Sequence, residues 1–89
     1  MKNGDTHVSG VSDNVRIFIH VHDGTLKMNF CKRIIGNPND EWEKKGETFK
    51  SKALPWSNVK GQVSQWLSSF GSDFGNLLDA IGQEYSRFA

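Results

Sequence analysis

The chain has 89 residues, of which 11% are aromatic and 24% charged, and its formal net charge is +1. This length corresponds to one small domain with little room for a deep active-site cleft. The aromatic content indicates a packed core and not a disordered chain. The single cysteine, Cys31, excludes an internal disulfide, and with a polar start it favours a reducing, cytoplasmic location. No apolar run approaches the roughly 20 residues that span a bilayer, so we expect no membrane partner.

Positive charge is concentrated in the middle of the chain. Residues 27–60 carry eight Lys and Arg against four acidic residues, whereas residues 1–26 and 61–89 are each slightly acidic. An excess of this size does not indicate nucleic-acid binding by itself.

The N-terminal segment, residues 1–13, is rich in Gly, Ser, Asp and Asn, and after Met1 its apolar residues are Val8 and Val11. This composition is typical of a flexible arm, or at best of a short edge strand added to a sheet. We therefore place a single α+β domain over residues 14–89.

Residues 15–34 have the pattern of a β-hairpin. Asp23-Gly24 is a two-residue type I′ turn signal, because both central positions of that turn need positive φ. Pairing His22 with Thr25 then places six apolar side chains on one face: Ile17, Ile19, Val21, Leu26, Met28 and Phe30. A slip of one residue would exchange the two faces, so the pattern specifies this register strongly.

The segment between the hairpin and the helices is less regular. A turn cluster at residues 35–40 contains Pro38, which excludes a central strand there. Residues 41–46 fit a short strand or a turn of helix, and the pattern does not choose between them. Residues 47–54 alternate with Phe49 on one side, which predicts a third strand whose edge Lys50 and Lys52 protect.

The apolar period becomes helical after Pro55, and we expect Ser57 to be the N-cap of a first helix. We expect Gly71 to end that helix and Ser72 to cap a second one. The first apolar stripe is Val59, Val63, Trp66, Leu67 and Phe70; the second is Phe74, Leu77, Leu78, Ile81, Tyr85 and Phe88. The predicted fold is α+β, an antiparallel three-stranded sheet built on the hairpin and packed against two C-terminal helices.

Glycine inside the second predicted helix has its own meaning. Gly75 and Gly82 share one side of that helix, although glycine costs roughly 1 kcal/mol there relative to alanine. A small-residue side indicates close approach by another backbone, either that of the first helix or that of a partner protein.

Catalytic and metal-binding patterns are weak. His20 and His22 point to one side of their strand, as a metal-ligand pair would, but no third ligand is indicated beside them. Cys31 has Arg16 as a cross-strand neighbour but no general base. We therefore expect a protein without catalytic residues, metal or cofactor.

The polar face of the hairpin is the candidate binding surface. It combines one aromatic ring with basic and amide groups: Arg16, Phe18, His20, Lys27, Asn29 and Arg33. An aromatic anchor within a polar rim suits a protein interface, and an aromatic ring among basic groups suits nucleic acid. A plain solvated face, with Phe18 covered by the N-terminal arm, fits the same residues. Lys44 and Lys45 form a second candidate surface.

The C-terminal quarter carries a resemblance. Gln65-Trp66-Leu67, Phe70-Gly71-Ser72, Phe74-Gly75, Ala80 and Ser86-Arg87 resemble the C-terminal helical pair of a small type I-F anti-CRISPR protein. That resemblance implies a sheet followed by two helices, and a stoichiometric phage inhibitor in the host cytoplasm. Such inhibitors bind the backbone subunits of the surveillance complex and block hybridisation to target DNA. No functional residue aligns on the sheet, so none is transferred.

The sequence thus predicts a small non-enzymatic inhibitor that binds a host or phage protein complex and occludes its target. The alternative is a nucleic-acid-binding protein that uses the same outer sheet face. A third class is a homo-oligomer that assembles through its helices or an open sheet edge.

Overall fold

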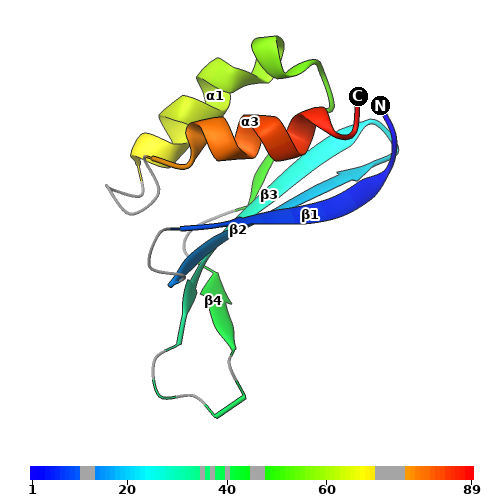
Figure 1. The fold of residues 1–89 in the computed structure, drawn as a ribbon. Helices are drawn as coiled ribbons and strands as arrows, with labels where there is room; N and C mark the ends of the chain where they lie inside the picture. The colour runs from blue at the N-terminus through cyan, green and yellow to red at the C-terminus, as the bar shows by residue number, and fades with distance from the viewer. Residues whose placement is uncertain (11–13, 35, 37, 40, 45–47, 70–75) are drawn as a thin grey trace.

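The computed structural model describes residues 1–10, 14–34, 36, 38–39, 41–44, 48–69 and 76–89. Two helices lie side by side on one face of an antiparallel sheet, and the end of the sheet that carries β4 projects away from them (Figure 1). The elements are β1 (Gly4–Ser9), β2 (Val15–His22), β3 (Thr25–Arg33), β4 (Trp42–Lys44), β5 (Phe49–Lys52), α1 (Trp56–Ser68) and α3 (Leu78–Ser86). The α+β class, with a sheet followed by two C-terminal helices, is confirmed.

The hairpin of β2 and β3 has the predicted register. His22 pairs with Thr25, and Ile17 pairs with Phe30 at the other end of the apolar face. Asp23 and Gly24 both have positive φ, 50° and 75°, as a type I′ turn requires. The six predicted apolar side chains of this face are at most 1% exposed.

The N-terminal segment supplies a strand. Residues 4–9 form β1, which pairs antiparallel with β2, so the structure has the edge strand of the two alternatives. Within β1, the side chain of Val8 faces the helices and is buried in the core. The backbone N–H of Lys2 donates to the carbonyl of Phe88 (2.8 Å), which holds the two ends of the chain together (Figure 1). Residues 11–13 lie outside the described part.

The far edge of β3 is shared by two short strands. The first residues of β3 pair with β5 and the last ones with β4, so the sheet has five strands instead of three. The strand predicted over residues 47–54 is shorter, Phe49–Lys52. The undecided segment forms a strand over Trp42–Lys44.

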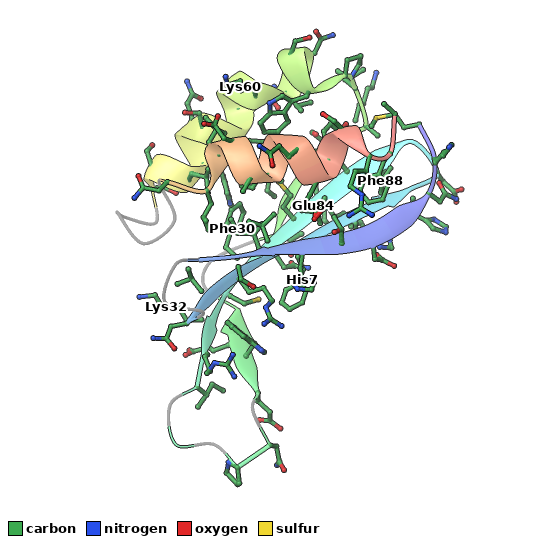
Figure 2. All side chains as sticks on the ribbon, in the orientation of Figure 1. His7, Phe30, Lys32, Lys60, Glu84 and Phe88 are labelled. Carbon is green, nitrogen blue, oxygen red and sulfur yellow. The ribbon has the colours of Figure 1, made fainter. Side chains whose placement is uncertain are left out.

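The core lies between the sheet and the two helices. Figure 2 shows Phe30 in this layer, whereas His7 lies on the opposite side of the sheet. Both helices contribute the predicted stripes: Val59, Val63 and Leu67 from α1, and Ile81 and Tyr85 from α3, with Leu77 just before it, are buried. Phe70 and Phe74 of those stripes lie outside the described residues.

The start of α1 differs from the prediction. The helix begins at Trp56 after Pro55, which occupies the N-cap position with φ −52° and ψ 148°. Ser57 is therefore inside the first turn, and its hydroxyl donates to Asn58 Oδ1 (3.3 Å) instead of capping the helix. The extended backbone of Pro55 ends the preceding segment, so the helix starts directly after it. The predicted caps Gly71 and Ser72 lie outside the described residues, as does Gly75.

The close approach at Gly82 comes from the first helix, but from a side chain and not from a backbone as the sequence predicted. A Cβ atom at this position would lie 2.6 Å from Nε1 and 2.7 Å from Cε2 of Trp56. The absence of a side chain thus lets α1 and α3 pack together. Within the described residues, neither helix has the length and apolar character needed to cross a membrane.

Candidate binding face

The side of the sheet opposite the helices, here called the outer face, has no helix of the described residues packed on it (Figure 1). Alternation along each strand directs every second side chain to it. Its described members are Asp5, His7 and Ser9 from β1, Arg16, Phe18, His20 and His22 from β2, Thr25, Lys27, Asn29, Cys31 and Arg33 from β3, Trp42 from β4, and Lys50 and Lys52 from β5. The outer face is therefore polar, basic and aromatic, in contrast to the apolar inner face.

One end of the outer face is an aromatic and guanidinium cluster. The guanidinium carbon of Arg16 lies 4.4 Å from the ring centroid of Trp42, and that of Arg33 lies 4.6 Å from it. Both distances are within cation–π range. The pairing of Arg33 with Trp42 across β3 and β4 brings these three side chains together.

Phe18 extends this cluster toward the middle of the sheet. Its ring lies 6.1 Å from that of His7 and 6.0 Å from the Arg16 guanidinium carbon. The ring is half-buried, so part of it stays open to a partner. We call Arg16, Phe18, Arg33 and Trp42 the arginine–aromatic cluster.

The other end carries lysines. Lys27 lies directly opposite Lys50 on β5, and Thr25 lies opposite Lys52. All three lysine side chains are exposed. Like charges directly opposite each other on a sheet destabilise it, so this group concentrates positive potential at some cost to the fold.

The histidines lie at the lysine end of the outer face, where His20 pairs with Lys27 and His22 pairs with Thr25, and each lies beside a carboxylate. His20 Nδ1 is hydrogen-bonded to Asp5 Oδ1, and His22 Nδ1 lies 3.2 Å from Asp23 Oδ2. The two imidazole rings stack with centroids 5.6 Å apart and an interplanar angle of 7°. In the described part of the chain, no group of three His, Cys, Asp or Glu side chains is placed to hold a metal ion. Cys31, the single cysteine, is buried in the sheet.

The structure separates the sequence-predicted residues into groups. Arg16, Phe18 and Arg33 belong to the arginine–aromatic cluster, whereas His20 and Lys27 are cross-strand neighbours further along. Asn29 Oδ1 accepts a hydrogen bond from Thr48 Oγ1 (2.6 Å), a contact that links β3 to the residue just before β5. The backbone of Lys44 pairs with Cys31, and Lys45 lies outside the described residues.

Sequence reasoning missed several members of the outer face. Trp42 and His7 come from segments whose strand character the sequence left open. Lys50 and Lys52 were recognised as edge residues, and their alternation with Phe49 was the signal that could have placed them beside Lys27.

Comparison of the chain with family models, with curated proteins and with solved structures finds no match.

Proposed function

We propose that the chain is a small, non-enzymatic protein-binding domain that attaches to its partner through the outer face. The arginine–aromatic cluster carries this proposal. Trp, Phe and Arg are enriched at protein interfaces, and Trp and Arg dominate the residues whose truncation costs the most binding energy. Here two aromatic rings and two guanidinium groups from three strands touch one another on an open face.

The finer proposal follows the sequence resemblance. A rigid sheet face held by a helical layer can occlude a surface of a larger assembly without any change of shape. We propose that the partner is the type I-F surveillance complex and that the chain acts as a phage inhibitor in the host cytoplasm. Binding to the backbone subunits would then block hybridisation to target DNA.

The general proposal is tested by affinity capture with matched variants. A protein partner that survives nuclease treatment should bind the natural chain and lose about tenfold or more affinity for Phe18→Ala and for Trp42→Ala. Lys60→Ala, an exposed position on α1, is the control and should bind normally. Equal binding by all three variants would contradict the use of the outer face.

The finer proposal is tested with purified type I-F surveillance complex and labelled target DNA. An equimolar amount of the chain should prevent the surveillance complex from binding the target DNA. The Trp42→Ala variant should need a higher concentration to produce the same inhibition. If the complex binds DNA equally well with an excess of the chain present, the anti-CRISPR proposal is wrong. The general proposal of a protein-binding outer face is not affected by that result.

A second candidate function is supported by the lysines at the other end of the face. Lys27, Lys50 and Lys52 could neutralise the phosphates of a single-stranded nucleic acid. This binding would weaken steeply with salt concentration, and Lys27→Glu would reduce it strongly. A protein complex would respond less to salt and more to Phe18→Ala.

A further inference from the structure

The outer edge of β5 is unpaired in the part of the chain that the structure describes. β5 pairs with β3 on one side, and no strand in the described residues pairs with it on the other. Ala53 N–H donates to the Gly24 carbonyl (2.9 Å), which fixes the alternation of the ladder. Phe49 and Ser51 therefore direct their backbone groups toward β3, and Lys50 directs its N–H and C=O outward.

A groove runs beside this edge on the helix side of the sheet. Its volume is about 560 Å³, and it lies between β5 and α1. The rings of Phe49 and Trp66 form its apolar floor, with centroids 5.9 Å apart. Gln62, Gln65 and Ser69 contribute polar groups from α1. A side chain on an added strand that pointed toward the helices would enter this groove.

Positive charge on the outer-face side of the β5 edge indicates what kind of segment could bind there. Lys27, Lys50 and Lys52 are exposed around it on the outer face. The carboxylates that the structure describes near this end, Asp5 and Asp23, are engaged by His20 and His22. Lysines on an edge discourage pairing with another copy of the same strand. They attract a strand that carries carboxylates.

We propose that the β5 edge docks an extended segment of a partner protein in which acidic and small apolar residues alternate. The segment pairs its backbone with Lys50, directs its carboxylates toward the three lysines and places its apolar side chains in the groove. Strand addition of this kind derives its affinity from main-chain hydrogen bonds and its specificity from alternate side chains. The β5 edge is separate from the arginine–aromatic cluster, so this inference does not depend on the proposed function.

The first test uses fluorescein-labelled peptides with the full-length chain. A peptide in which glutamate and valine alternate should bind, and a scrambled peptide of the same composition should bind about tenfold more weakly, because it cannot keep both faces in register. A peptide of alternating lysine and valine should not bind. Hydrogen exchange at the Lys50 amide should slow when the first peptide is added. Absence of binding, equal binding of the scrambled peptide, or unchanged exchange at Lys50 would overturn the proposal.

The second test separates backbone pairing from charge. Lys50→Pro removes the outward N–H without removing a bond to β3, and proline is tolerated on an edge strand whose N–H faces solvent. Lys50→Gln removes only the charge. Binding of the glutamate–valine peptide should fall in both variants and about fivefold further in Lys50→Pro, the loss expected for one net hydrogen bond. Equal losses would overturn strand addition, and Lys60→Gln controls for long-range charge.

Discussion

The two faces of one β-hairpin behave very differently. On the inner face, Ile17, Ile19 and Phe30 are at most 1% exposed and are enclosed by α1 and α3. On the outer face, Phe18 is half-buried and Lys27 is exposed, and the strands β1 and β5 supply their cross-strand neighbours His7 and Lys50. The same strands therefore supply buried apolar side chains on one side and leave polar, basic and aromatic groups accessible on the other.

This difference has an energetic consequence. Burial of a large apolar side chain stabilises the fold by about 1.5–3 kcal/mol, whereas an exposed cation–π contact contributes about 0.5–1 kcal/mol. We therefore expect substitutions in the arginine–aromatic cluster and at the lysines to cost less stability than substitutions of the large side chains on the inner face.

A phenylalanine-to-alanine substitution on each face tests this comparison directly. Phe30→Ala should lower the free energy of unfolding by about 3–5 kcal/mol, because it leaves a cavity in the core. Phe18→Ala, the same change on the outer face, should cost less than about half as much, since the ring is only half-buried. Urea unfolding of both variants measures the two values. Equal losses would show that Phe18 belongs to the structural core.

The inner face was predictable because its signal is local. The turn residues Asp23 and Gly24 set the register, and alternation over residues 15–34 then fixes which side chains are buried. The helical stripes have the same property: the period of Val59, Val63 and Leu67 identifies the buried side of α1 without knowledge of the sheet.

The outer face was predictable only in part because it depends on strand neighbours. Arg16, Phe18 and Arg33 could be placed from the hairpin alone. Trp42 lies in a strand of three residues, too short to show a period, and its contact with Arg16 requires β4 to pair with β3. The predicted start of α1 was wrong for another reason. Pro55 occupies the N-cap position, two residues before the predicted cap Ser57, because its extended backbone ends the preceding segment.

The contrast between covered and open surfaces extends to the two helices. Gly82 on α3 packs against Trp56, whereas Gly61 on α1 faces open space, so the two positions can be compared directly. Gly82→Ala should destabilise the protein by about 1–2 kcal/mol, because its Cβ would meet the Trp56 ring at 2.6 Å and overpacking exceeds the gain in helix propensity. Gly61→Ala on α1 has nothing within 4 Å of the new Cβ and should stabilise by about 0.5–1 kcal/mol. Thermal unfolding of the two variants gives the signs. Stabilisation by both would mean that Trp56 moves aside freely.

The smallest expected effect concerns a polar atom on the covered side. The Tyr85 hydroxyl donates to the carbonyl of Leu54, at the segment that joins β5 to α1. Burial raises the pKa of Tyr85 above its ordinary value of 10.0. Tyr85→Phe keeps the ring and its packing but removes this hydrogen bond, so it should cost about 1 kcal/mol at neutral pH.

The pH dependence distinguishes this hydroxyl from the exposed titrating groups. Because the pKa of Tyr85 is higher in the folded chain, the unfolded chain releases the proton first, and above pH 10.0 the folded state holds more protons than the unfolded one. The contribution of Tyr85 is therefore complete below that pH and is lost as pH rises through the folded pKa. Urea unfolding from neutral to strongly alkaline pH should show a steeper decline for the natural chain than for Tyr85→Phe, which keeps every lysine. Parallel declines would show that the alkaline loss does not come from Tyr85.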